Sequence, residues 1–249
     1  MKQYGLIGYS LRHSFSKNYF REKFQKENIP DCDYGLFPLS EIGEFPNLLE
    51  KMNFYGLNVT FPYKEKIMPY LDGLDSEAEA VGAVNTIHFN RKGNSLYLKG
   101  FNTDVIGFRQ SLLPHLNDRH DRALIFGSGG AAKAVAHVLK SLSVDFLFVS
   151  RNPKQKRQIA YAEIEDSTLK SHRLLINCTP LGTFPKPEEM IPIEVGAIGA
   201  EHLVYDLVYH PERTKLIRQA AKQGAKTLNG LQMLKLQADA SWKIWNLKN

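Results

Sequence analysis

The sequence predicts an α/β protein with two domains, on three observations. Between residues 123 and 209, short apolar runs alternate with helical patterns, as in a parallel sheet whose strands are joined by crossover helices. A glycine-rich turn directly follows the first of these runs. Residues 1–104 mix further strand-like and helical segments, so another α/β domain precedes the parallel one. A length of 249 residues fits one to two domains at about 150 residues each.

The elements of the first domain begin with a strand and a helix. We expect this helix to have Ser16 as its N-cap and to carry Phe20 and Phe24 on one face. The strand-like segments are residues 3–9, 33–39, 56–61 and 95–102. In the second domain, the apolar runs are residues 123–127, 145–150, 173–179 and 202–209. Between the first two of these runs, one helix face consists of Ala134, Val135, Val138, Leu139 and Leu142.

The domain boundaries follow from this order of elements. We assign residues 1–104 to the first domain and residues 105–228 to the second. Residues 229–249 are predicted to contain a helix whose Leu, Met and Trp side chains need a partner surface. We expect this C-terminal helix to pack back on the first domain and complete it.

The composition limits the classes of partner. The chain has 32 Lys and Arg against 26 Asp and Glu, a net charge of +6, which favours nucleic acid, acidic lipid or a phosphorylated small molecule. No apolar run could span a membrane and no signal peptide is evident, so a cytoplasmic protein without a membrane partner is expected. Cys32 and Cys178 lack the spacing of a zinc site, which predicts reduced thiols and no metal.

The glycine-rich turn is the first candidate binding site. Gly127-Ser128-Gly129-Gly130-Ala131-Ala132 fits G-x-G-x-x-A between a strand and a helix. Glycines at these positions let backbone N–H groups approach a pyrophosphate at the positive end of the helix. A glycine-rich motif without further support could also be a flexible turn that binds nothing. The strand before it, the helix after it and a second strand about 20 residues on favour dinucleotide binding.

The end of the second strand predicts which dinucleotide binds. An NAD site usually places Asp or Glu there, whereas this strand ends in Ser150, Arg151 and Asn152, followed by Lys154. A guanidinium can stack on adenine and pair with the 2′-phosphate of NADP, so NADP is predicted over NAD. A solvated basic loop, which also includes Lys156, is the alternative.

Four loops of the first domain are rich in small polar residues. They are residues 8–16, 58–64, 82–86 and 100–104. Taken singly, each fits turn and capping chemistry, with Asn85 and Asn102 as turn formers. Together they supply hydroxyls, amides, one amine and one carboxylate, which suit a polyhydroxylated small molecule and a proton transfer.

At these loops the sequence resembles the shikimate dehydrogenase family. HSxS, NVTxPxK, GAVNT, GxNTD, GSGGAA, NCTPLG, DLVYxPxxTxL and GLxMLxxQA occur in the family's order between residues 8 and 237. The resemblance implies an N-terminal substrate domain and a Rossmann-like NADP-binding domain. It also implies NADP-linked interconversion of 3-dehydroshikimate and shikimate, on the route to chorismate and aromatic amino acids. A small-molecule substrate, no nucleic acid, and a monomer or homodimer are the partners we expect.

The resemblance also implies roles for individual residues. Lys64 matches the family's catalytic lysine and Asp104 its paired aspartate. Substrate-binding positions are matched by Ser14, Ser16, Thr60, Lys64, Asn85, Asp104, Tyr209 and Gln237. Cofactor positions are matched by Gly127, Ser128, Gly129, Gly130, Ala131, Ser150, Arg151, Asn152, Lys154, Leu207 and Gly230. His13 receives no chemical role.

The chemistry of these residue types fits the implied reaction. Hydride transfer to a carbonyl leaves negative charge on oxygen, which a nearby ammonium such as Lys64 stabilises and protonates. The sequence departs from the family's pattern at Ser10 and Lys17, where proline is usual, in Ser150-Arg151-Asn152, and at Cys178, where alanine is usual. Two alternatives stay open: a quinate/shikimate dehydrogenase of broader specificity, and a non-catalytic nucleotide-sensing regulator motivated by the +6 charge.

Overall fold

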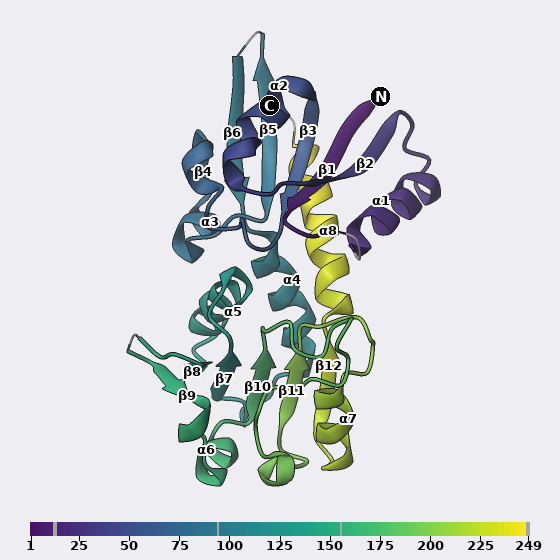
Figure 1. Cartoon of the computed structure of the whole chain (residues 1–249). Helices are drawn as coiled ribbons and strands as arrows, with labels where there is room; N and C mark the ends of the chain where they lie inside the picture. Colours follow the sequence, from purple (N-terminus) through teal and green to yellow (C-terminus); the bar gives the residue numbers. More distant parts are fainter. Residues whose placement is uncertain (12–13, 94, 155, 248–249) are drawn as a thin grey trace. The chain divides into compact units, whose positions relative to one another are not determined.

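The computed structural model describes residues 1–11, 14–93, 95–154 and 156–247, so His13 lies outside the described residues. The chain forms two compact units (Figure 1). Unit 1 consists of Met1–Ile106 and Lys235–Asn249, and unit 2 of Gly107–Leu234. The sequence placed the two boundaries after residues 104 and 228.

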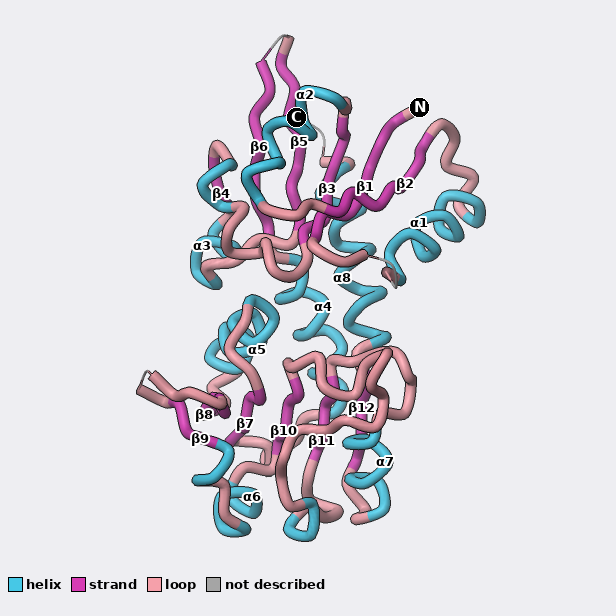
Figure 2. The backbone as a smooth tube through the Cα atoms, viewed as in Figure 1, coloured by secondary structure: helices cyan, strands magenta, loops and turns pink. Residues whose placement is uncertain are grey.

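Unit 1 contains a six-stranded mixed sheet with the order β2-β1-β3-β5-β6-β4 (Figure 2). Strand β1 pairs in parallel with β2 and β3, whereas β5 is antiparallel to β3 and β6. The end of β3, the start of β5 and the end of β6 therefore meet at one edge. The strands are β1 (Lys2–Gly8), β2 (Cys32–Pro38), β3 (Phe54–Val59), β4 (Gly73–Leu74), β5 (Thr86–Lys92) and β6 (Ser95–Phe101).

Alternating side chains bury both faces of this sheet. On one face, Ile7 and Leu57 pack with Phe45 at the start of α2 (Phe45–Lys51). On the other face, Tyr4 packs with Trp245 near the end of α8 (Leu231–Trp245). The C-terminal helix therefore packs on the first unit, as the sequence predicts. Each such large apolar side chain contributes about 1.5–3 kcal/mol when fully buried.

Helix α1 (Phe15–Lys26) covers the same face of the sheet as α8. Its buried residues, Phe20 and Phe24, confirm the predicted helix face. The predicted N-cap is wrong, because Ser14 holds that position and Ser16 is the second residue of the helix. The Ser16 side chain forms a hydrogen bond with the buried Tyr34 hydroxyl.

Unit 1 has further short helices around its sheet. They are the 3-10 helices η1 (Ile42–Glu44) and η2 (Met68–Tyr70) and the α-helix α3 (Ser76–Val81). Helix α4 (Thr103–Leu112) begins in unit 1, directly after β6. Its first turn therefore starts at the edge where the ends of β3 and β6 meet.

Unit 2 contains a six-stranded sheet with the order β12-β11-β10-β7-β8-β9, in which every pair is parallel. The chain enters at β7 in the centre, moves to one side through β8 and β9, and then reverses to β10. This is the strand order of the doubly wound, Rossmann-like fold. The strands are β7 (Arg122–Phe126), β8 (Asp145–Ser150), β9 (Gln158–Ala160), β10 (Leu174–Asn177), β11 (Leu203–Asp206) and β12 (Lys226–Asn229).

Helices cover the sheet of unit 2. Helix α5 (Gly130–Ser141) buries Ala134, Val135, Val138 and Leu139, which confirms most of the predicted face, while Leu142 lies just beyond its end. Leu169 of α6 and Leu216 and Ala220 of α7 belong to a separate apolar cluster with Leu124 of β7. The remaining helices are α6 (Asp166–Ser171), α7 (Lys215–Lys222), η3 (Leu113–His115), η4 (Tyr161–Glu163) and η5 (Val195–Ala197).

The strand predictions hold with shorter bounds in unit 2. Strand β11 ends at Asp206 rather than at residue 209, because the Asp206 side chain accepts a hydrogen bond from the Val208 N–H and turns the chain. Strands β4, β5, β9 and β12 were not among the predicted segments. No helix of the described residues is long and apolar enough to cross a membrane.

Candidate active site

Lys64 lies in the turn that follows β3 in unit 1. The turn is held by Tyr63, whose buried hydroxyl donates to the Leu39 carbonyl at 2.7 Å. The Lys64 carbonyl accepts from the Val84 N–H at 2.7 Å, which ties the turn to the segment before β5. The Lys64 side chain is 19% exposed, so its amine is shielded but reachable from solvent.

Asp104 lies opposite Lys64, in the first turn of α4. Its Oδ2 accepts a hydrogen bond from Lys64 Nζ at 2.5 Å, and only 8% of its side chain is exposed. A carboxylate in the first turn of a helix also interacts favourably with the positive end of the helix dipole. The structure therefore brings the two residues predicted to be catalytic into direct contact.

Asn85 holds the second oxygen of Asp104. The Asn85 Oδ1 accepts the Thr103 N–H at 2.7 Å, so the other side of the amide must be its NH₂ group. That group donates to Asp104 Oδ1 at 2.9 Å. Both carboxylate oxygens of Asp104 thus accept hydrogen bonds from named donors.

Gln237 reaches the same place from α8. Its Oε1 lies 3.3 Å from Thr103 Oγ1 and 3.5 Å from Asn85 Nδ2. Lys64, Asn85, Asp104 and Gln237 are therefore joined in one hydrogen-bonded group, although they are far apart in sequence. These side chains come together because the ends of β3 and β6 and the start of β5 lie at the same edge of the sheet, where α8 also passes.

The other predicted substrate residues have different surroundings. Ser14 is half-buried at the N-cap position of α1, and Ser16 contacts Tyr34. Thr60 is half-buried directly after β3, where its N–H donates to the Ile7 carbonyl at 2.9 Å. Tyr209 belongs to unit 2 and is half-buried in the loop after β11.

Sequence reasoning missed a set of buried hydroxyls behind this group. Ser241 of α8 is fully buried, and its Oγ lies 2.8 Å from Thr86 Oγ1 and 3.2 Å from Thr103 Oγ1. Asn58 donates to Ser241 Oγ at 2.9 Å. Thr86 and Thr103 occur inside the GAVNT and GxNTD motifs, but nothing in the sequence indicates that Ser241 joins them.

The glycine turn of unit 2 has the geometry of a phosphate-binding loop. Gly127 has a φ of +108°, a conformation that residues with a side chain rarely adopt. A Cβ at Gly129 would meet nothing within 4 Å, so the backbone there is open to a ligand. Gly129 is the N-cap of α5, with Gly130 and Ala131 in its first turn and Ser128 exposed beside it. These residues fit a pyrophosphate at the helix N-terminus.

The end of β8 carries the predicted 2′-phosphate residues. Ser150 is half-buried and its Oγ accepts the Asn152 N–H at 3.3 Å, while Arg151 and Lys154 are exposed. Arg157, by contrast, pairs with Asp145 at 3.1 Å. The cationic side chains at the strand end are therefore presented on the surface of unit 2.

Leu207 and Gly230, two of the cofactor positions that the resemblance implies, lie next to each other in unit 2. A Cβ at Gly230 would overlap the Leu207 carbonyl oxygen, and the Gly230 N–H donates to the Val208 carbonyl at 3.2 Å. The loop after β11 is anchored by the fully buried Asp206, which accepts from Asn177 Nδ2 at 2.9 Å and Thr214 Oγ1 at 2.6 Å. Burial raises the pKa of Asp206 despite these hydrogen bonds.

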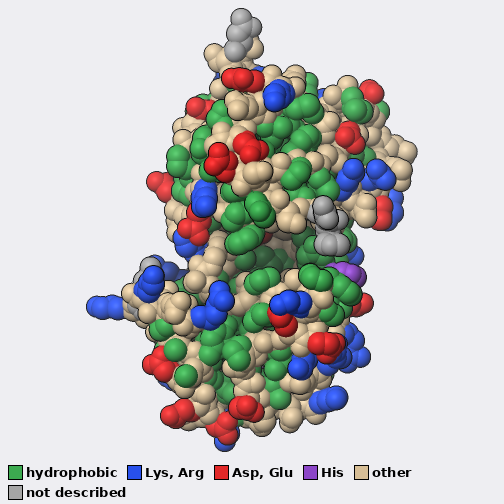
Figure 3. Space-filling model, in the orientation of Figure 1, with side chains coloured by type: hydrophobic (Ala, Val, Ile, Leu, Met, Phe, Trp, Pro, Cys, Tyr) green, Lys and Arg blue, Asp and Glu red, His purple; other side chains and the backbone are tan. Residues whose placement is uncertain are grey.

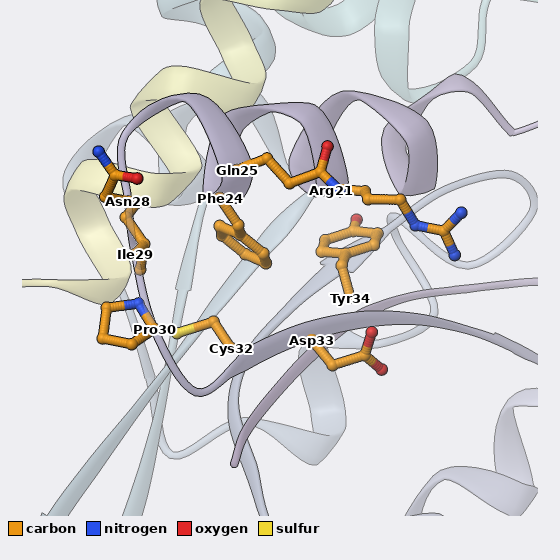
Figure 4. Close-up of a pocket in the computed structure, with 9 residues that line it drawn as sticks. All are labelled: Arg21, Phe24, Gln25, Asn28, Ile29, Pro30, Cys32, Asp33 and Tyr34. Atoms are coloured by element: carbon orange, nitrogen blue, oxygen red, sulfur yellow. The ribbon is translucent and has the colours of Figure 1, made fainter.

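Other candidate features do not form a site with these residues. Neither Cys32 nor Cys178 is in a disulfide bond. Within the described ranges, no group of three His, Cys, Asp or Glu residues could hold a metal. A separate cavity of about 480 Å³ lies between α1 and the edge strand β2, where Arg21, Cys32 and Tyr34 are among the lining residues (Figure 4).

Known proteins resemble both units of the chain. Residues 6–87 match the family model of the shikimate dehydrogenase substrate binding domain. A shikimate dehydrogenase (NADP(+)) of Clostridium botulinum is 39% identical over 253 residues, which cover 98% of this chain and 96% of that protein. The chain belongs to the shikimate dehydrogenase family.

Solved structures support the same family and fold. One similar solved structure is that of a chorismate mutase/shikimate 5-dehydrogenase fusion protein from Clostridium acetobutylicum. That protein is 38% identical to this chain, and the two structures match with a TM-score of 0.86 over 99% of this chain and 91% of that chain. Shikimate 5-dehydrogenase from Thermus thermophilus, solved with NADP(H) and shikimate, is 28% identical, with a TM-score of 0.85 over 99% and 94%.

Two departures from the shikimate dehydrogenase pattern, at Lys17 and Cys178, lie in regular local structure. Lys17 lies in the first turn of α1, where the backbone accepts either lysine or the usual proline. Cys178 directly follows β10, and its N–H donates to the Phe126 carbonyl at 2.9 Å. The backbone of the nucleotide-binding sheet therefore continues through the position of this replacement.

Proposed function

We propose that this chain catalyses the reversible, NADP-dependent reduction of 3-dehydroshikimate to shikimate. Family membership supports the reaction class, and the observation that carries the proposal is the contact between Lys64 and Asp104. An amine and a carboxylate in hydrogen-bond contact, with limited solvent access, are the groups that proton transfer to a carbonyl oxygen requires. The proposed reaction is a step in the biosynthesis of chorismate and the aromatic amino acids.

Lys64 is the proposed general acid. The cofactor, held by the residues of unit 2, would supply a hydride to the carbonyl carbon of the substrate, so negative charge would develop on the carbonyl oxygen. The Lys64 ammonium donates a hydrogen bond to that oxygen and then its proton. In the reverse direction, the neutral Lys64 amine takes the proton from the hydroxyl of shikimate.

Asp104 orients Lys64 and the substrate. Its Oδ2 accepts from Lys64, and its Oδ1 accepts from Asn85, so the carboxylate is fixed in one orientation. A hydroxyl of the substrate can donate to the remaining lone pairs of this carboxylate. The proposed substrate-binding set also contains Ser14, Ser16, Thr60, Tyr209 and Gln237.

NADP is the proposed cofactor, and unit 2 has the residues to hold it. The open backbone at Gly129 and the start of α5 suit the pyrophosphate. Arg151, with Ser150, Asn152 and Lys154 beside it, suits the 2′-phosphate. Leu207 and Gly230 complete the proposed cofactor contacts.

The test is the initial rate of nicotinamide reduction in a two-by-two design. Shikimate or quinate is combined with NADP or NAD, each at saturating concentration, with purified protein. Fast turnover with shikimate and NADP alone is expected. Comparable rates with quinate or NAD would indicate the broader quinate/shikimate dehydrogenase, and binding of NADP without turnover in any combination would favour the nucleotide-sensing regulator.

The expected partner is the small-molecule substrate. On the side of each unit shown in Figure 3, acidic and basic side chains are interspersed, so neither of these surfaces is a continuous basic one of the kind that nucleic acids contact. We infer a monomer or a homodimer, which light scattering at several protein concentrations distinguishes.

A further inference from the structure

Tyr34 is a buried residue of β2 that lies behind the proposed active site. It is 2% exposed, and its ring stacks on Phe20 of α1 at 4.4 Å with an interplanar angle of 13°. Its hydroxyl donates to Asn58 Oδ1 at 2.8 Å. Figure 4 shows the Tyr34 ring below α1, at the end of the cavity between α1 and β2.

A chain of hydrogen bonds leads from Tyr34 to Asp104. Asn58 Nδ2 donates to Thr86 Oγ1 at 3.1 Å. Thr86 Oγ1 donates to Asn85 Oδ1 at 3.1 Å. Asn85 Nδ2 then donates to Asp104 Oδ1 at 2.9 Å. Each of these side chains except Tyr34 lies at the edge where β3, β5 and α4 meet.

The donors in this chain all point in one direction. Because Tyr34 O–H donates to Asn58 Oδ1, the Asn58 NH₂ group must face Thr86. The Thr86 hydroxyl accepts from Asn58 and can donate to Asn85 Oδ1 at 3.1 Å or to Ser241 Oγ at 2.8 Å. Aligned hydrogen bonds polarise one another, so the donor at one end strengthens the bond at the other.

We propose that Tyr34 is a positioning residue for the Lys64–Asp104 pair, an inference that rests on the proposed function. Its hydroxyl fixes the Asn58 amide, and the amide fixes the Thr86 hydroxyl and the Asn85 side chain that holds Asp104. Burial raises the pKa of Tyr34, so the hydroxyl remains a donor across the working pH range. The Ser16 hydroxyl, which bonds to Tyr34, connects a proposed substrate residue to the same chain.

Tyr34→Phe removes the hydroxyl and keeps the ring that stacks on Phe20. We expect kcat for shikimate oxidation to fall by about three- to tenfold, the effect of weakening one neutral hydrogen bond to the catalytic carboxylate. The KM for NADP should not change. Tyr205→Phe is the matched control, because Tyr205 is also buried and bonds Ser111 Oγ at 2.7 Å, but lies in unit 2. It should lower thermal stability and leave kcat unchanged.

Thr86→Val breaks the same chain in the middle without a change in side-chain shape. If Tyr34 acts through Thr86, the double variant Y34F/T86V has the same kcat as T86V alone. Multiplied losses in the double variant would overturn the proposal. So would an unchanged kcat in Y34F when the wild-type protein is active. Absence of wild-type turnover would instead contradict the proposed function itself, and the inference with it.

Discussion

Lys64 and Asp104 are held by the backbone as well as by each other. The Lys64 carbonyl accepts from the Val84 N–H, and Asp104 is the second residue of α4, whose first residue, Thr103, donates its N–H to Asn85 Oδ1. The backbone positions of Lys64 and Asp104 therefore do not depend on the contact between their side chains. A substitution at Lys64 can remove the amine and leave Asp104 in place, which makes single-residue tests informative.

Lys64→Ala should lower kcat by about 10²- to 10⁴-fold, the usual contribution of a general acid. The KM for shikimate should stay within about tenfold of the wild-type value, because the amine acts mainly in the transition state. Steady-state kinetics with both substrates varied would measure both constants. Lys66→Ala, at an exposed neighbouring lysine, is the control with no expected effect. A normal kcat in Lys64→Ala would remove this residue from the mechanism.

Arg151→Ala should raise the KM for NADP far more than the KM for NAD, because only NADP carries the 2′-phosphate. Arg157→Ala is the matched control. Its guanidinium pairs with Asp145 and lies 5.5 Å from the Phe146 ring centre. Arg157→Ala should therefore change the KM for NADP and the KM for NAD by the same factor. Equal effects of Arg151→Ala on the two cofactors would show that this side chain does not read the 2′-phosphate.

At the scale of elements, the central parallel strands and α5 could be predicted because apolar runs and helical periodicity mark them directly. The short strand β12 and the hairpin strand β5 were missed, since β12 is only partly buried and β5 follows a loop-like motif. Polar clustering indicated Lys64, Asn85 and Asp104 as a group. The contribution of Ser241 could not be predicted, because its hydroxyl reaches Thr86 only when α8 packs on the first sheet.

Two glycines at element junctions give opposite expectations. Gly129→Ala should lower stability by no more than about 1 kcal/mol, the cost of alanine at an N-cap, because the added Cβ enters open space. It should raise the KM for NADP if that space receives the pyrophosphate. Gly230→Ala should lower stability by more than about 1 kcal/mol, since its Cβ overlaps the Leu207 carbonyl. Thermal unfolding and NADP kinetics on both variants separate the two effects. An unchanged KM for NADP in Gly129→Ala would contradict the assignment of the open space to the pyrophosphate.

At the scale of the whole molecule, buried histidines make stability depend on pH. Burial, with a smaller effect of Lys99, lowers the pKa of His88 from 6.5, and burial lowers the pKa values of His115 and His120 in the same direction. Between the folded and unfolded pKa values, the unfolded chain binds more protons than the folded one. Stability from these groups is therefore present above pH 6.5 and is lost as the pH falls toward their folded pKa values.

His88→Gln should reduce this pH dependence. The free energy of unfolding of the wild-type protein should fall between about pH 7 and pH 5.5, and the fall should be smaller in the variant. Urea unfolding of both proteins at the two pH values measures the difference. Because His115 and His120 remain, part of the dependence should persist. An identical fall in both proteins would mean that His88 is protonated equally in the folded and unfolded states.

The division of unit 1 between two distant parts of the chain affects when this unit can fold during synthesis. Residues 1–106 leave the ribosome before unit 2 does, whereas Trp245, which packs on Tyr4, is synthesised only after unit 2. Until then the aromatic face formed by Tyr4, Phe20 and Phe24 lacks its covering helix. Unit 2, by contrast, is one continuous stretch that can fold as soon as it emerges. Loss of α8 would thus damage a unit most of which is translated before unit 2.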